Sequence, residues 1–374
     1  MTLRFIAVFL AFAALAGCKS SECTTEESPS DLIEQAKGIE DREIYWYQRG
    51  ADATRAIWAK YRLSSDVALL SDGKRGVAPS FSFATHGFSL LLDNVSTFWR
   101  MDLAAEAIDA YFGDFSSVYP DRAANGRNDE VLKWAIACAR ASRTTGSKKY
   151  LDEARTLYDA LWLNHVDNAL GGGMWHRSDE KTSKSAAANF SAVVAALGLY
   201  NATQDVKYLL QARKLYKWAA ERMFDPATGA VREALFVDGT RSDAESAENV
   251  GVFIGASMRL YRATGSAIYL VNAKKAADRL IGSSDSVRCA RSIAEGLSNG
   301  VAMRYLSELA RRPGCEKYRD YILANARSAW TSRRLSDGIN GPDWRKPPLG
   351  GEAVDPRYAV SAAILYMSAS RACR

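Results

Sequence analysis

The chain has 374 residues and a formal net charge of +6, from 49 basic and 43 acidic side chains, and 48% of its residues are hydrophobic. This hydrophobic share supports a large buried core. The two signs of charge are interspersed without basic blocks, which argues against nucleic acid as a dedicated partner. Only three histidines are present and none of the six cysteines makes a CxxC pair, so we expect neither a metal centre nor a cofactor.

The N-terminal residues Leu3 to Leu15 are apolar apart from Arg4. This run is too short to span a bilayer, and it has the basic start and short apolar core of a secretory signal. It ends in Leu15-Ala16-Gly17-Cys18, which resembles a bacterial lipobox and implies cleavage before Cys18 and a lipid on that cysteine. An ordinary signal peptide with an incidental cysteine is the alternative.

We therefore expect three parts along the chain: a lipoprotein signal peptide over 1–17, a lipid-anchored polar tether and leader over 18–50, and a folded domain over 51–374. Residues 19–30 read KSSECTTEESPS, and such a stretch cannot bury enough apolar surface to fold. The expected location is the bacterial cell envelope, on the periplasmic face or the cell surface, where the lipid on Cys18 would contact the membrane.

From residue 51 onward, apolar residues recur at helical spacing almost everywhere, whereas the alternation typical of strands is rare. We therefore expect an all-α domain of twelve helices. Their predicted ranges are 51–63, 81–96, 100–113, 128–144, 148–164, 184–203, 206–223, 245–263, 266–282, 292–311, 317–332 and 355–372. The links that follow even-numbered helices are short, and most links that follow odd-numbered helices are long.

A repeated pattern begins at Tyr150, Tyr208 and Tyr269, each time after a turn such as Thr145-Gly146-Ser147. The copies are 58 and 61 residues apart, and a degenerate fourth copy begins near Tyr318. Self-similarity at a nearly constant period indicates one supersecondary unit stacked on itself, and here that unit is a pair of helices. We expect the repeat tyrosines to be packing residues.

Short links make antiparallel helix hairpins, so the long loops all fall at one end of the assembly. The even helices are rich in small residues, as in Ser185 to Ala196, and suit a crowded inner ring, while the odd helices carry a charged face. We therefore predict an (α/α)6 toroid of six inner and six outer helices, with the long loops and the N-termini of the inner helices on one face. An open helical solenoid is the alternative, and it would need polar caps at its ends.

The cysteines allow one pairing to be rejected and another to be predicted. Cys289 and Cys315 flank the tenth helix, and a helix of that length spans about 30 Å, whereas disulfide Cα atoms lie within about 7 Å. Cys315 and Cys373 both follow the C-terminal ends of neighbouring inner helices. We predict a disulfide between these two.

The fourth helix begins Asn128-Asp129-Glu130. Asn128 is a good helix cap and acids in a first turn complement the helix dipole, so this start has a purely structural explanation. In the predicted toroid, however, both acids lie at the mouth, under the loops. Glycosidases use two carboxyl groups, one to donate a proton and one to attack or to guide water, and retaining enzymes hold them about 5–5.5 Å apart. Neighbouring side chains can meet that separation.

This segment and several others resemble glycoside hydrolase family 76. The matching blocks, in chain order, are Asp129 to Ala137, Thr145 to Leu151, Gly171 to Trp175, Lys184 to Ala186, Asn249 to Gly255 and Gly265 to Ala273. The resemblance extends across residues 51–372 and implies an (α/α)6 fold. It also implies the activity of the family's known members, which are retaining endo-α-1,6-mannanases, with fungal cell-wall relatives thought to be transglycosylases.

Carried over by position, the resemblance implies that Asp129 is the nucleophile and Glu130 the acid/base. The chain departs from the family pattern at three of these places. Glu130 replaces the second of two aspartates, Lys133 replaces the first of two tryptophans, and Ser246-Ala247-Glu248 stands before Asn249 where an aromatic residue is usual.

Five further residues are candidate substrate contacts. Trp175 would stack on a sugar face, Gly173 would give its loop unusual backbone geometry, and Lys184 and Asn249 would hydrogen-bond hydroxyl groups. His86 would lie near the mouth. Each has a structural alternative: packing under a loop for Trp175, a flexible loop tip for Gly173, a helix end for Lys184 and Asn249, and a core position for His86.

We therefore expect a retaining α-mannosidase, an endo-α-1,6-mannanase by resemblance, that acts as a monomer on mannose-containing oligo- or polysaccharides. Asp129 would form a glycosyl-enzyme intermediate, and Glu130 would protonate the leaving oxygen and then activate water. A catalytically inactive, glycan-binding lipoprotein of the same fold is the alternative. A sugar epimerase of this fold would rely on inward histidines, and the three in the chain leave little room for that.

Overall fold

The computed structural model describes residues 38–39, 42–73, 77–95, 101–282, 288, 290, 292 and 295–374. Cys18, the predicted signal peptide and residues 18–37 of the predicted tether lie outside the described residues. None of the helices in the described ranges combines the length and the apolar character that a membrane span needs.

Helices make up most of the described chain. Their bounds are α3 (Glu43–Tyr61), α4 (Phe81–Val95), α5 (Met101–Val118), α6 (Asn128–Thr145), α7 (Lys148–His165), α8 (Ala186–Thr203), α9 (Val206–Met223), α10 (Ala247–Thr264), α11 (Ala267–Gly282), α12 (Ser298–Ala310), α13 (Glu316–Thr331) and α14 (Pro356–Ala372). Two antiparallel ribbons pair β1 (Arg62–Ser64) with β2 (Val67–Leu70) and β3 (Ser183–Ser185) with β4 (Ala234–Phe236). The sequence did not predict these strands, because three or four residues are too few to show an alternation.

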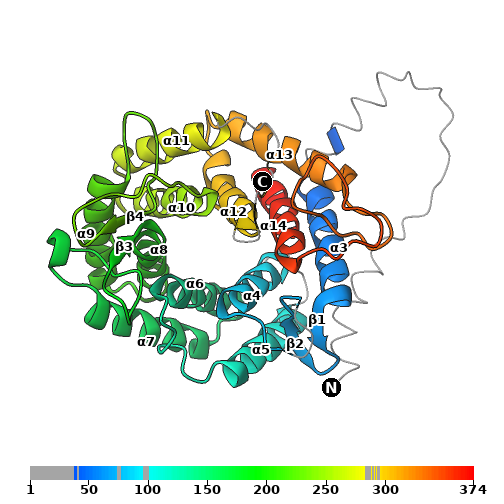
Figure 1. Cartoon of the computed structure of the whole chain (residues 1–374), viewed down its shortest axis with the longest axis horizontal. Helices are drawn as coiled ribbons and strands as arrows, with labels where there is room; N and C mark the ends of the chain where they lie inside the picture. The colour runs from blue at the N-terminus through cyan, green and yellow to red at the C-terminus, as the bar shows by residue number, and fades with distance from the viewer. Residues whose placement is uncertain are drawn as a thin grey trace.

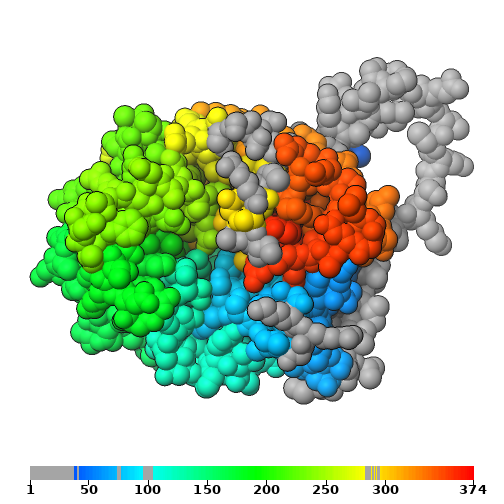
Figure 2. All heavy atoms as spheres, viewed as in Figure 1, coloured from blue at the N-terminus to red at the C-terminus, as the bar shows by residue number. Residues whose placement is uncertain are grey.

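The helices form two concentric rings (Figure 1). Along the inner ring of α4, α6, α8, α10, α12 and α14, each helix contacts the next, and α14 contacts α4. The first outer helix, α3, packs on the last inner helix, α14, so that blue N-terminal atoms lie beside red C-terminal ones (Figure 2). The predicted (α/α)6 toroid is therefore confirmed, and the closed ring rules out the open solenoid.

Helix α3 begins at Glu43, eight residues before the predicted start at 51. The reason is the burial of Trp46, which is 1% exposed and stacks on Tyr366 of α14 with ring centroids 6.3 Å apart. Residues 43–50, predicted as leader, therefore belong to the folded ring.

The repeat tyrosines tie neighbouring outer helices together. The hydroxyl of Tyr208 on α9 donates to Asp159 on α7 across 3.2 Å, and that of Tyr318 on α13 donates to Asp278 on α11 across 2.8 Å. Tyr150 on α7 makes the equivalent bond to α5. All three tyrosines are at most 1% exposed, so they are packing residues of the repeat, as predicted.

Small residues bring the inner helices close together. A Cβ atom at Gly251 of α10 would lie 2.7 Å from the Cα of Ala302 on α12, a distance that only glycine tolerates. Between the rings, the buried Trp134 of α6 stacks on Phe115 of α5 with ring centroids 3.5 Å apart. Glycine contacts within the inner ring and aromatic contacts between the rings thus hold α6 and α10, which carry the acids of the site, in fixed positions.

The predicted disulfide between Cys315 and Cys373 is wrong, since the structure forms no bond between them. Cys315 precedes α13, is fully buried and is hydrogen-bonded to Lys274 of α11. Both cysteines follow inner helices as predicted, but the thiol of Cys315 is directed to the outer ring.

Candidate active site

The first turn of α6 is bonded to the loop between α7 and β3, at the end of the ring where the inner helices begin. The backbone N–H of Asn128 donates to the carbonyl of His176 across 3.0 Å, and its side-chain amide donates to the carbonyl of Trp175 across 2.9 Å. Asn128 therefore anchors the helix to the loop rather than capping it, which was its predicted role. This anchor fixes the position of the two acids that follow.

Asp129 and Glu130 converge on one guanidinium group. The Nε of Arg127 lies 3.0 Å from Glu130 Oε1 and 3.7 Å from Asp129 Oδ1, so these two oxygens cannot be farther apart than the sum of the distances, 6.7 Å. This limit admits the separation of about 5–5.5 Å found in retaining glycosidases, and most of the roughly 6.5–9.5 Å range of inverting ones lies beyond it. Arg127 is the most exposed of the three side chains, at 44% against 16% for Glu130 and 3% for Asp129.

The pKa values of the two acids are shifted in opposite directions. Burial by itself would raise the pKa of Asp129, but three neighbouring groups outweigh it and lower that pKa: Lys133, Arg127 and His176. Burial raises the pKa of Glu130, and the charge on Asp129 raises it further. One group is thus kept ionised beside another that holds its proton to higher pH, which is the division that a nucleophile and a general acid require.

Lys133 connects Asp129 to a third acid. Its Nζ donates to Asp129 Oδ2 across 3.1 Å and forms an ion pair with Glu248 Oε1 of α10 at 2.6 Å. Burial would lower the pKa of Lys133, but Glu248 and Asp129 raise it above its usual value and keep the ammonium group charged. Two of the departures from the family pattern therefore meet in space, and an ion pair stands where the resemblance implies aromatic side chains.

His176 is a site residue that the sequence reasoning missed. Its Nδ1 lies 3.7 Å from Asp129 Oδ1 and 2.9 Å from the hydroxyl oxygen of Ser185. Burial lowers the pKa of His176, which favours a neutral ring at neutral pH. The available signal was its place in the chain, directly after the matched block that ends at Trp175.

Asp129 Oδ1 is the carboxylate oxygen left without a hydrogen bond among the residues that the structure describes. The other oxygen, Oδ2, is held by Lys133. This asymmetry leaves Oδ1, the oxygen nearest His176 and Arg127, with a lone pair available for a covalent bond.

Three of the predicted substrate contacts, Trp175, Gly173 and Lys184, meet in the loop around Asp167. Trp175 is 4% exposed and its indole N–H donates to Asp167 across 2.6 Å. Lys184 is 0% exposed and its ammonium group donates to Asp167 at 2.8 Å and to the Gly173 carbonyl at 3.0 Å. Gly173 has a φ of 83° and packs against Trp218. These contacts give the three residues a structural part in the loop, while their contact with a sugar stays a prediction.

The other two candidates lie apart from this loop. Asn249 is 3% exposed in the first turn of α10, where its backbone N–H donates to the hydroxyl oxygen of Ser246. His86 lies on α4, is 5% exposed and lines a cavity along the ring axis together with Lys133 and Glu248. Burial lowers the pKa of His86 to about 4, so its ring is neutral. Of the seven predicted site residues, the structure therefore brings Asp129 and Glu130 together directly and Asn249 beside their network.

Metal ligands do not gather at this site or elsewhere in the described ranges, where no group of three or more His, Cys, Asp and Glu side chains could hold an ion. The groups available for chemistry are the carboxylates of Asp129 and Glu130 and the basic side chains around them.

A family model described as glycosyl hydrolase family 76 matches residues 32–341. No curated protein matches the chain. Among solved structures, the α-1,6-mannanase GH76A from Salegentibacter sp. HEL1_6 is similar with a TM-score of 0.80 and 24% identity, over 87% of this chain and 98% of that one.

Two further structures show the same likeness. The Lin0763 protein from Listeria innocua has a TM-score of 0.79 at 22% identity, over 87% of this chain and 96% of that one. Dfg5 from Chaetomium thermophilum, solved in complex with glucosamine, has a TM-score of 0.69 at 13% identity, over 94% of this chain and 92% of that one. At such identities the likeness shows a shared fold.

Proposed function

Since the chain belongs to glycosyl hydrolase family 76, and is a glycoside hydrolase by family, we propose that it is a retaining α-mannosidase that cleaves α-1,6-linked mannan internally. The observation that carries this proposal is the paired carboxylates at the start of α6, with Asp129 held ionised and the pKa of Glu130 raised. The printed names of similar structures support the substrate class, because one is an α-1,6-mannanase and an inactive variant of it is in complex with α-1,6-mannotriose.

In the first step, Asp129 Oδ1 attacks the anomeric carbon of the mannosyl unit. Glu130 gives its proton to the leaving glycosidic oxygen, so that the first product departs as a neutral alcohol and a glycosyl ester remains on Asp129. In the second step, Glu130 takes a proton from water, and the resulting hydroxide displaces Asp129 from the anomeric carbon. The mannose then leaves with its original anomeric configuration.

The surrounding basic groups support each step. Lys133 bonds Asp129 Oδ2 at 3.1 Å and thereby orients Oδ1, the oxygen proposed to attack. The Arg127 guanidinium lies 3.0 Å from Glu130 and 3.7 Å from Asp129, so it can steady whichever carboxylate carries the charge at that stage. Because Arg127 is 44% exposed, its side chain has room to move aside when a glycan enters.

Secretion and lipidation are part of the proposal. The lipobox-like Leu15-Ala16-Gly17-Cys18 supports a lipid on Cys18, which would hold the enzyme at the bacterial envelope within reach of extracellular glycans. Metabolic labelling with a palmitate analogue would test this, with Cys18→Ala as the control that should lose the label and leave the membrane fraction.

The test of the activity is incubation of the purified chain with α-1,6-mannan and chromatography of the released sugars. We expect the wild type to release oligosaccharides, and Asp129→Asn to release none while keeping the circular dichroism of the wild type. Asp152→Asn on α7 is a matched control, because it neutralises an acid whose side chain is 43% exposed on the outer ring. Equal sugar release by the wild type and Asp129→Asn would show that the site is assigned wrongly.

A catalytically inactive, glycan-binding protein is the second candidate. It is favoured by the 3% exposure of Asp129 and by the ion pair that engages the same carboxylate, since both oppose direct contact with a substrate. Tight binding of α-1,6-mannotriose by calorimetry, without turnover and unrestored by Glu130→Asp, would select this candidate over the enzyme.

A further inference from the structure

A cavity of about 1140 Å³ runs along the axis of the ring. Its inner end is lined by His86, Lys133 and Glu248, and its other end by residues at the C-terminal ends of the inner helices, such as Arg143 and Asn201. Lys133 and Arg143 are ten residues apart on α6, so the cavity extends about 15 Å beyond the catalytic network. Arg143 and Asn201 are exposed, so the cavity opens at the end of the ring opposite the proposed active site.

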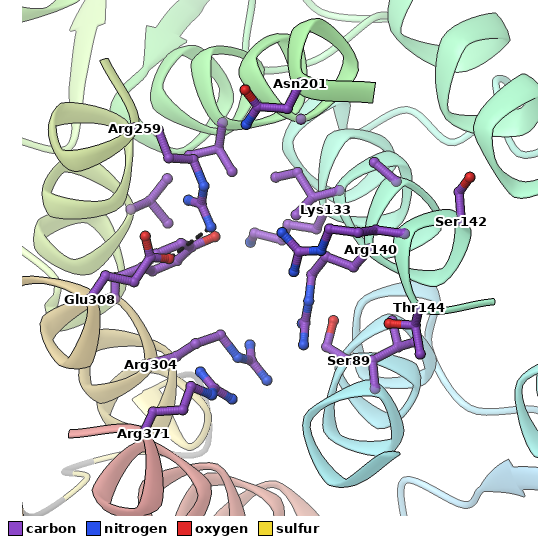
Figure 3. Close-up of a pocket in the computed structure, with 18 of the residues that line it drawn as sticks. Ser89, Lys133, Arg140, Ser142, Thr144, Asn201, Arg259, Arg304, Glu308 and Arg371 are labelled. Atoms are coloured by element: carbon purple, nitrogen blue, oxygen red, sulfur yellow. Dashed lines mark hydrogen bonds and ion pairs between the residues drawn. The ribbon is translucent and has the colours of Figure 1, made fainter. Parts of the chain in front are cut away.

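The lining of this cavity is strongly basic. Nine arginines and one lysine face two glutamates, although the whole chain has a net charge of only +6. Six of the arginines come from a repeated Arg-x-x-Arg pattern at the ends of three inner helices: Arg140 and Arg143 on α6, Arg259 and Arg262 on α10, and Arg371 and Arg374 at the end of α14. Residues three apart lie on the same face of a helix, and Figure 3 shows Arg140, Arg259, Arg304 and Arg371 directed into one space.

Helix ends explain only some of these arginines. Cations in a last turn complement the helix dipole, and Arg143, Arg262 and Arg371 occupy such positions. Arg140 and Arg259, however, lie five residues before their helices end, where the effect of the dipole is small. A separate reason is needed for the arginines deeper in the cavity.

Protein carboxylates neutralise only part of this charge. The buried Asp93 pairs with three guanidinium groups, those of Arg140, Arg304 and Arg371. One carboxylate thus faces three positive charges. Removing charged groups from water is costly unless opposite charge is supplied, so two positive charges remain here for another anion to neutralise.

Glu308 leaves a similar excess at the other side of the cavity. It pairs with Arg259 at 2.7 Å and with Arg262 at 2.8 Å. The Nη1 of Arg259 is buried and has no hydrogen-bond acceptor among the described residues. Arg143 likewise forms no hydrogen bond or ion pair within the described part of the chain, and burial together with the charges of Arg140 and Arg259 lowers its pKa. Both guanidinium groups therefore have N–H donors available for a ligand.

We propose that this axial cavity binds a phosphate group, free or carried by a sugar, between Arg140, Arg143 and Arg259. The planar guanidinium fork matches the oxygens of a phosphate and binds them through paired, charge-assisted hydrogen bonds. The neutral groups that share the lining, Ser89, Ser142, Thr144 and Asn201, can hydrogen-bond hydroxyls of an ester (Figure 3). The volume is that of a site for a small organic molecule. This site is independent of the proposed hydrolase reaction.

The test is isothermal titration calorimetry of the full-length chain, in a phosphate-free buffer of low ionic strength, with inorganic phosphate and with mannose 6-phosphate. Mannose is the neutral control. Binding of either phosphate compound supports the site, and the tighter of the two identifies the source of the phosphate. Salt should weaken the binding, since the interaction is between charges. The absence of binding by both phosphate compounds would overturn the proposal.

Two variants locate the site. Arg143→Gln removes an exposed side chain that has no partner in the described structure, and Arg259→Gln leaves Glu308 paired with Arg262, so both should fold. Each removes charge-assisted hydrogen bonds and should weaken phosphate binding by about tenfold or more. Arg155→Gln on α7 makes the same charge change far from the cavity, and should bind as the wild type does. Unchanged affinity in both cavity variants would contradict the assignment, even if the wild type binds phosphate.

Discussion

Replacing Lys133 by methionine tests the buried charge network beneath the proposed nucleophile. Lys133 Nζ lies 2.6 Å from Glu248 and 3.1 Å from Asp129, and the three side chains are 16%, 18% and 3% exposed. Without the lysine, two carboxylates remain buried with no cation between them. Loss of one partner of a buried ion pair costs about 3–5 kcal/mol, and the residual exposure of Glu248 favours the lower end. We therefore expect Lys133→Met to lower the free energy of unfolding by about 3 kcal/mol.

The assay is urea denaturation at pH 7, followed by circular dichroism, of the wild type, Lys133→Met, Glu248→Gln and the double variant. The double variant removes the lysine and one of its two carboxylates, so it should be more stable than Lys133→Met. Lys207→Met is a matched control, because its ion pair with Asp159 is exposed and such pairs contribute about 1 kcal/mol or less. Equal losses in Lys133→Met and Lys207→Met, or a double variant no more stable than Lys133→Met, would refute the reasoning.

Activity should respond to the same substitution through the pKa of Asp129. Lys133 is the strongest of the groups that hold this pKa down against burial. Without it, the pKa of Asp129 should rise, and the acidic limb of the profile of kcat/KM against pH should move to higher pH. An acidic limb at the same pH as in the wild type would show that Lys133 does not keep Asp129 ionised.

Three other changes give clear expectations. Glu130→Gln should lower kcat on α-1,6-mannan by about 10²–10⁴-fold and remove the basic limb of the pH profile, which the raised pKa of Glu130 places above the usual value of about 4.3; a retained basic limb would assign the proton to another group. Asp93→Asn should lower the free energy of unfolding, measured in urea, by about 3–5 kcal/mol, because three arginines lose their shared anion. Since the folded-state pKa of Asp93 is lowered, its contribution is present above the unfolded value of about 3.9 and is lost as the pH falls through the folded value, so a difference that does not shrink in acid would contradict this. Trp134→Ala should cost about 3–5 kcal/mol, because the ring is fully buried against Phe115, and a loss below about 1 kcal/mol would show that this contact is not part of the core.

The ring architecture could be predicted because the repeat and the loop lengths both report on topology. Tyr150, Tyr208 and Tyr318 recur at a regular interval, and their hydroxyls bond to the preceding outer helix. Local signals failed where few residues define an element. The ribbon strands are three or four residues long, and the start of α3 depends on the contact of Trp46 with Tyr366, which is 320 residues away in the chain.

The two acids of the site could be predicted because they are adjacent in the chain and belong to a matched block. Their environment could not, because it is assembled from separate elements. Glu248 comes from α10 and His176 from the loop before β3, and only the closed ring brings them to Lys133 and Asp129. The burial of Trp175 and Lys184 around Asp167 likewise depends on long-range packing that composition and spacing do not encode.

The anomeric configuration of the first product tests the central claim most directly. Proton NMR of α-1,6-mannotetraose during the first minutes of hydrolysis distinguishes the two anomers before mutarotation mixes them. If Asp129 attacks and Glu130 supplies the proton, the new reducing end appears as the α-anomer. A first product in the β-configuration would mean that water attacks directly, and that Asp129 forms no bond to the sugar.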